Sequence, residues 1–213
     1  MPGEIDYLLV DADPYFDPLW ARVEEARIPV ALQIGVSGYM QAFGPLWGED
    51  PNVSEAQMSA FQWVTCFGRR PIMAMVPALV LHNLFGRLPR LQMLSIENGS
   101  SWIPRLLTDM DGAARHSVNT LGEASGRWLG GPITDAPSRL FREHFSVAPS
   151  FEQDVPALVQ CIGAERVLFG SDWPHPEGLA APRHFLREVE GLAPAQVRRI
   201  LCENTAGLLG LAA

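Results

Sequence analysis

Residues 167–178 read VLFGSDWPHPEG, and the rest of the chain can be read outward from this stretch. The apolar run at 167–169 is typical of a buried strand, and the Gly, Ser, Asp and Pro residues that follow end it in a loop. In α/β barrels and open α/β sheets, the chemistry lies at the carboxyl ends of parallel strands. Asp172 is therefore the first candidate for a functional residue.

Other apolar runs resemble this one. Residues 91–96 (LQMLSI) run directly into Glu97, residues 29–34 (PVALQI) end at a glycine, and residues 145–149 give a weaker strand signal. Helical periodicity lies between the runs, and alternating strands and helices predict a parallel sheet with covering helices. We expect an α/β fold with about four parallel strands, built as a single domain over residues 1–213.

The expected helices lie at 18–26, 54–67, 71–85 with a kink at Pro77, 104–115, 138–143, 154–162 and in the tail from 182 onward. Residues 7–10 are a candidate short strand, and residues 35–54 are expected to form a long loop of the functional or lid type. A closed eight-stranded barrel needs at least ~200 residues and typically ~250. The predicted strands lie too far apart along the sequence for this chain to contain eight of them. This leaves a small open sheet or part of a barrel.

The composition excludes several classes of function. All 16 basic residues are arginine against 24 acidic residues, for a net charge of −8. Without lysine there is no Schiff-base lysine and no P-loop, and an acidic chain without basic clusters is a poor partner for nucleic acid or an anionic membrane. We expect that no run is long enough to span a bilayer, and three scattered cysteines indicate free thiols. We expect a cytoplasmic protein.

Four motifs in order resemble the amidohydrolase-related family, the branch of the amidohydrolase superfamily with the aminocarboxymuconate-semialdehyde and dihydroxybenzoate decarboxylases. They lie at residues 16–21 (FDPLWA), 82–89 (HNLFGRLP), 95–102 (SIENGSSW) and 169–178 (FGSDWPHPEG). The resemblance implies a metal-dependent (β/α)8 barrel. It places this chain on the C-terminal half, strands five to eight, and hence implies an incomplete TIM-type barrel.

The same resemblance implies a set of metal ligands. Asp172 matches the aspartate of strand eight, and Glu97 stands at the ligand position of strand six. Gln33 falls where the family usually has a histidine on strand five, and its amide oxygen is a weaker ligand for zinc but tolerable for harder cations. The strand-one pair has no counterpart, since no histidine precedes His82. The expected cofactor is a divalent zinc, manganese or iron ion.

Two reactions on a small organic acid or amide follow from the resemblance. In hydrolytic relatives the cation lowers the pKa of water towards ~7 and the strand-eight aspartate, here Asp172, carries the proton to the leaving group. In decarboxylating relatives the metal orients the substrate. His175 is a candidate second acid/base or carboxylate-binding group. Trp173, Trp102 and Gln33 are candidate substrate contacts.

Structural alternatives stand beside these assignments. Asp172 could cap a following helix, Glu97 could be a turn carboxylate, and Trp102 could be a core residue. His82 is expected to be a satisfied core or interface histidine; the histidines expected to face solvent are His116, His144 and His184. The alternative function is a non-catalytic remnant or binding module without metal. A half barrel exposes strand edges and an apolar face, so we also expect a homo-oligomer.

Overall fold

The computed structural model describes residues 12–35, 38–116, 129–150, 153–175 and 178–211. Its strands are β1 (Val30–Gln33), β2 (Met93–Ile96) and β3 (Phe145–Val147). The α-helices are α2 (Asp17–Ala26), α3 (Tyr39–Phe43), α4 (Ala60–Thr65), α5 (Arg70–Leu81), α6 (Leu84–Arg87), α7 (Ile103–His116), α8 (Pro137–His144), α9 (Val155–Ile162), α10 (Pro194–Arg198) and α11 (Asn204–Leu208). Short helical turns are η1 (Pro14–Phe16), η2 (Gly44–Trp47), η3 (Glu55–Gln57), η4 (Ala164–Arg166), η5 (Pro182–Arg187) and η6 (Arg199–Glu203).

The sheet is parallel, as the alternating pattern predicts, and its strand order is β1-β2-β3. The expected fourth strand at 167–169 is present only in part. Val167 forms one parallel bridge to Val147, and the Leu168 amide donates to the Val147 carbonyl at 2.8 Å. The next amide, Phe169, donates instead to the carbonyl of Ile200 at 3.0 Å. The ladder therefore stops after one residue pair, and the described sheet has three strands where about four were expected.

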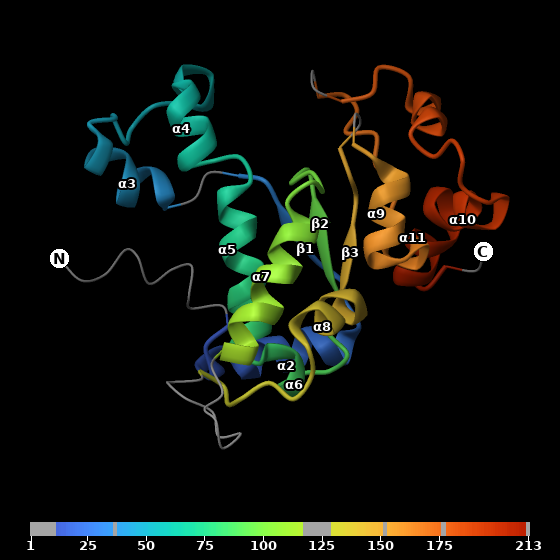
Figure 1. Ribbon diagram of the computed structural model, residues 1–213, viewed down its shortest axis with the longest axis horizontal. Coiled ribbons are helices and arrows are strands. Elements are labelled where there is room, and N and C mark those ends of the chain that lie inside the picture. The colour runs from blue at the N-terminus through green and yellow to red at the C-terminus, as the bar shows by residue number, and fades with distance from the viewer. Residues whose placement is uncertain (1–11, 36–37, 117–128, 151–152, 176–177, 212–213) are drawn as a thin grey trace.

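The main core lies between the sheet and the helices α5, α7 and α8, which pack together along one face of it (Figure 1). Phe141 and Phe145 stack with centroids 4.7 Å apart. His144 is buried there too, stacked on Phe85, and its Nδ1 lies 2.9 Å from the Leu91 carbonyl. The expectation that His144 faces solvent is therefore wrong. The last turn of α8 runs directly into β3, and this places its side chain in the core.

The expected long loop at 35–54 contains short helices in its described part, α3 and η2. Tyr39 and Met40 of α3 pack with Cys66 in a second small apolar cluster, which explains why this segment is ordered locally. The expected helix at 54–67 is split, because a capping box between Ser59 and Gln62 starts α4 afresh at residue 60. Both α3 and α4 stand away from the sheet in Figure 1. The candidate strand at 7–10 lies outside the described residues.

Residues 60–81 have the length and apolar composition of a membrane span, with a mean hydropathy of 1.3 over an 18-residue window, contrary to the expectation that no run is long enough. In the structure this stretch forms α4 and α5, separated by a turn. Ile72, Val76 and Leu79 of α5 belong to the main core. A helix buried in a protein core shares this composition with a membrane span.

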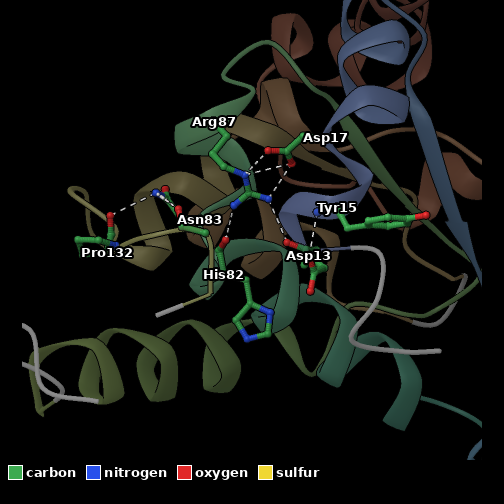
Figure 2. A network of polar contacts seen from close by, with 9 residues as sticks. Asp13, Tyr15, Asp17, His82, Asn83, Arg87 and Pro132 are labelled. Carbon is green, nitrogen blue, oxygen red and sulfur yellow. Dashed lines mark hydrogen bonds and ion pairs between the residues drawn. The ribbon is translucent and has the colours of Figure 1, made fainter. Parts of the chain in front are cut away.

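A polar network around Arg87 joins segments at the amino-terminal ends of the strands (Figure 2). Its guanidinium makes a bidentate contact with Asp17, at 2.9 Å for the closest pair, and donates to the backbone carbonyls of Ala12 and His82. Asn83, in the left-handed conformation at φ 58°, donates to the carbonyls of Gly130 and Pro132. The network ties the first helix, the α5–α6 junction and a loop 47 residues further along to one another.

His82 departs from its expected role. Its Nδ1 atom is buried and has no hydrogen-bond partner among the described residues, so the prediction of a satisfied core histidine is wrong. Burial lowers the pKa of His82, and the nearby Arg87 guanidinium lowers it further. The ring is therefore neutral under ordinary conditions, the protonation state that burial next to a cation favours.

Candidate functional site

Glu97 and Asp172 both follow the carboxyl ends of buried segments of the sheet, and both have left-handed backbone conformations. Their φ angles are 61° and 54°. Residues other than glycine rarely adopt this conformation, and such strained positions cluster at functional sites. The turn at Glu97 is held by Asn98, whose side-chain amide donates to the carbonyls of Leu32 at 2.7 Å and Ile96 at 2.9 Å. The residue that follows Glu97 thus joins the ends of β1 and β2.

Three side chains from these strand ends converge. One ligand atom from each of Glu97, Asp172 and His175 lies within 4.8 Å of the other two. The Nδ1 atom of His175 is 3.2 Å from Oδ1 of Asp172, and the His175 amide donates to the Asp172 carbonyl at 2.9 Å. Gln33, at the end of β1, donates its amide N–H to Oε2 of Glu97 at 2.9 Å. The sequence-predicted residues Gln33, Glu97, Asp172 and His175 therefore meet at one edge of the sheet.

The cluster has the composition and the spacing of a cation site. Ligands that surround one transition-metal ion at about 2.0–2.3 Å stand roughly 3–4.5 Å apart, so donors within 4.8 Å need only small side-chain rotations. Two carboxylates and an imidazole suit manganese, iron or zinc. His175 fits as the third ligand, a role that the sequence reasoning did not assign to it. The spacing of Asp172 and His175 in one loop is the signal that could have suggested it.

Gln33 contacts the cluster through Glu97. The hydrogen bond from its amide nitrogen restrains the carboxylate, as an outer partner of a metal ligand does. This contact makes Gln33 a positioning residue for Glu97 in the arrangement observed.

A cavity of about 440 Å³ opens in front of the cluster. Gln33, Glu97, Asp172 and His175 all line it, together with Ser150 and the aromatic side chains of Trp63 and Phe67. The two rings have centroids 4.8 Å apart. Trp63 and Phe67 were missed by the sequence reasoning, because residues 54–67 carry only an ordinary helical pattern. A helical pattern does not indicate which helix will contribute side chains to a cavity at the end of the sheet.

The two tryptophans expected to contact substrate lie elsewhere. Trp102 is only 4% exposed, and its Nε1 donates to the carbonyls of Asn98 and Gly99, so it packs beneath the loop that carries Glu97. Trp173 is 66% exposed and is not among the lining residues of the cavity. The structure also excludes the alternative that Asp172 caps a following helix, because residues 173–175, directly after it, form a turn and a bend.

Comparison with known proteins connects this geometry to a family. The family described as amidohydrolase matches residues 8–211. Among functionally curated proteins, no similar sequence was found. A solved amidohydrolase from Mycobacterium avium subsp. paratuberculosis K-10 is 32% identical with a TM-score of 0.79; the alignment covers 95% of this chain and 47% of that one.

Two solved decarboxylases share the fold. The 5-carboxyvanillate decarboxylase of Sphingomonas paucimobilis is 20% identical with a TM-score of 0.69, over 94% of this chain and 55% of that one. A dihydroxybenzoic acid decarboxylase from Polaromonas sp. JS666, with bound manganese and the inhibitor 2-nitroresorcinol, is 18% identical with a TM-score of 0.61, over 94% and 55%. The chain thus spans about half the length of each of these proteins.

Proposed function

The chain belongs to the amidohydrolase family, and from this premise we propose that Glu97, Asp172 and His175 hold a divalent cation at which a small organic acid or amide is hydrolysed or decarboxylated without oxidation. The convergence of these three donor groups within 4.8 Å at the carboxyl ends of the strands carries the proposal. The manganese in the Polaromonas decarboxylase supports the nature of the cation.

When bound, the cation would polarise a carbonyl or carboxylate group of the substrate. Asp172 and His175 are placed to move the proton, since their Oδ1 and Nδ1 atoms lie 3.2 Å apart. In a hydrolysis, Asp172 accepts a proton from the attacking water and returns it to the leaving group. In a decarboxylation, the bond to the carboxyl carbon breaks, carbon dioxide leaves, and the same pair supplies a proton to the carbon left behind.

We further infer that the chain corresponds to the second half of a longer barrel, strands five to eight. The coverage of 95% of this chain but 47% of the Mycobacterium amidohydrolase supports this reading. So does β1, which forms one edge of the described sheet with Ala31 and Gln33 exposed. Another chain segment, either the remaining strands or a second copy, fits such an edge.

The second candidate function is a non-catalytic remnant that keeps the fold without the metal. The observation that favours it is Gln33, which stands where the resemblance implies a histidine ligand on strand five and which donates its amide N–H to Glu97. Metal binding separates the two candidates, because only the enzyme needs the carboxylate cluster to retain cation affinity.

Calorimetric titration of the metal-free chain with Mn²⁺ tests the proposal. We expect one binding event that weakens at least about 100-fold in Asp172→Asn, which keeps the size of the side chain and removes its charge. The matched control is Asp109→Asn, an exposed carboxylate of α7 that pairs with Arg105, and it should bind as the unmodified chain does. Absence of Mn²⁺ binding, or equal binding by Asp172→Asn, contradicts the proposal and favours the remnant.

A further inference from the structure

The short helix α4 turns apolar side chains outward. Gln62 is buried, and its side chain donates to the Asp50 carbonyl at 2.8 Å and accepts from the Ser59 amide at 2.9 Å. Phe61 and Val64, which lie three positions apart and therefore share a helix face, are exposed. A helix on the surface of a soluble protein normally buries its apolar face and exposes its polar face. In α4 this arrangement is reversed.

The exposed face of α4 continues onto η2. The Trp47 ring packs against Phe61 with centroids 5.6 Å apart, and Leu46 directly precedes Trp47. Leu46 and Val64 are 73% exposed, Trp47 is 69% exposed and Phe61 is 38% exposed. We call these four residues the α4 patch. They present on the order of 500 Å² of apolar side-chain surface, which is the size of the largest and often functional patch on a typical monomer.

The opposite side of α4 belongs to the candidate site. Trp63 lines the first cavity and also a second cavity of about 810 Å³, whose lining includes Arg69 and Arg70 at the start of α5. Val64 stands at the border, because it lines the second cavity too. The other three residues of the α4 patch line neither cavity, so the proposed function does not account for their exposure.

Charges are arranged around the α4 patch in a self-complementary way. Residues 56–68 contain no charged side chain. Acidic groups lie beside the first turn of α4, where the Glu49 carboxylate accepts from the hydroxyl that caps the helix at 3.2 Å and Asp50 is exposed. Basic groups, Arg69 and Arg70, follow the last turn. Two copies that pair α4 antiparallel about a twofold axis would place the acidic end of each helix opposite the basic end of the other.

We propose that the α4 patch is the interface between two copies of this chain, related by a twofold axis that crosses α4. A second copy fits because each copy supplies both halves of the charge pattern. The area fits as well, since mutual burial of the patch covers roughly 1,000 Å² in total, the lower end for a specific interface. Trp47 is of the residue type that contributes most to the energy of such contacts. Both α3 and α4 project away from the sheet in Figure 1, and the interface requires neither the cation nor the open edge of β1.

Sedimentation equilibrium of the full chain at concentrations from about 1 to 100 µM tests the proposal. We expect a monomer–dimer equilibrium whose Kd rises at least about tenfold in Val64→Asp, because the new carboxylate would be buried without a partner at the interface. The matched control is Leu19→Asp, which changes a 57% exposed leucine of α2 outside the patch and should dimerise as the unmodified chain does. Both positions are exposed, and the thermal unfolding curve of each variant verifies that it is folded.

An exchange of charges tests the antiparallel arrangement. Asp50→Arg and Arg69→Asp should each raise the Kd of the dimer at least about threefold, because each change brings like charges together across the axis. The double variant should recover most of the loss, since it restores opposite charges at both ends. A double variant that dimerises no better than the weaker single variant contradicts the twofold interface.

Three further outcomes would overturn the proposal. The first is a chain that stays monomeric over the whole concentration range, and the second is a dimer that Val64→Asp leaves unchanged. The third is binding of a monomeric chain to phosphatidylcholine vesicles that is lost in Val64→Asp, because this result assigns the α4 patch to a lipid surface. Failure of Mn²⁺ binding does not affect the inference, since the patch contains no residue of the cation cluster.

Discussion

The two ends of the sheet use the same kinds of residue in opposite ways. At the amino-terminal ends of the strands, each nitrogen of the Arg87 guanidinium donates to an acceptor on Asp17 or on a backbone carbonyl (Figure 2). At the carboxyl ends, the carboxylates of Glu97 and Asp172 and the imidazole of His175 line a cavity. One ligand atom from each of the three side chains lies within 4.8 Å of the other two. A polar cluster with its hydrogen bonds completed holds the fold together, whereas one whose acceptors converge on open space can bind a ligand.

Backbone strain follows the same division. Each end contains residues in the left-handed conformation, Asn83 at one and Glu97 and Asp172 at the other. The strain at Asn83 is offset locally by two hydrogen bonds from its own side chain to backbone carbonyls. At Glu97 the neighbouring Asn98 supplies the corresponding bonds, which leaves the Glu97 side chain to point into the cavity. Strain alone therefore does not mark a functional residue.

The largest expected effect is on the free energy of unfolding, and it comes from breaking the Arg87 network at the amino-terminal ends of the strands. Arg87→Met should lower the free energy of unfolding by roughly 2–3 kcal/mol, because it leaves the Asp17 carboxylate and two carbonyls without their donor; partial exposure of the pair keeps the loss below that of a fully buried one. Urea denaturation in the presence of a chelator measures it. Arg105→Met, which breaks an exposed pair on α7, is the control and should cost about 0.5 kcal/mol or less. A loss no larger than that of the control would show that the network adds little to stability.

A smaller effect is expected at the carboxyl ends of the strands, where a substitution should change the affinity for Mn²⁺ and not the stability of the fold. Gln33→Leu removes the hydrogen bond to Glu97 and should weaken Mn²⁺ binding about tenfold while leaving the unfolding free energy nearly unchanged. Gln41→Leu is the matched control, since its exposed amide donates to the Pro51 carbonyl and Gln41 lines neither cavity. Unchanged Mn²⁺ affinity in Gln33→Leu would mean that Glu97 needs no restraint from β1.

The smallest effect concerns pH. Burial lowers the pKa of His144 from its ordinary value of 6.5, and the hydrogen bond to the Leu91 carbonyl acts in the opposite direction. His144 therefore binds a proton more readily in the unfolded chain than in the folded chain. Stability is complete above pH 6.5 and declines as the pH falls below it. We expect a lower unfolding free energy at pH 5 than at pH 7 in chelator, and a smaller difference in His144→Phe. His82 has a pKa lowered in the same direction, so part of the decline should remain.

The control for the pH experiment is His184→Gln, which changes an exposed histidine and should leave the difference between pH 7 and pH 5 as it is. An identical decline in His144→Phe and in the unmodified chain would assign the pH dependence to other groups.

Local patterns in the sequence were enough to place the main features of the fold. Apolar runs end at Glu97 and Asp172, and the parallel order of their strands brings such ends to one edge, as the structure confirms. The family followed from four short motifs and is confirmed over residues 8–211. These features depend on periodicity and on order along the chain, which a sequence displays directly.

Tertiary packing decided the rest. Trp63 and Arg70 line the cavities together with strand-end residues that are far from them in sequence, and His175 joins the carboxylates because its loop folds back on Asp172. Packing likewise buried His144 and Trp102, and it shortened the fourth strand to a bridge. Such outcomes depend on which distant surfaces meet, and helical or strand periodicity carries no information on that pairing.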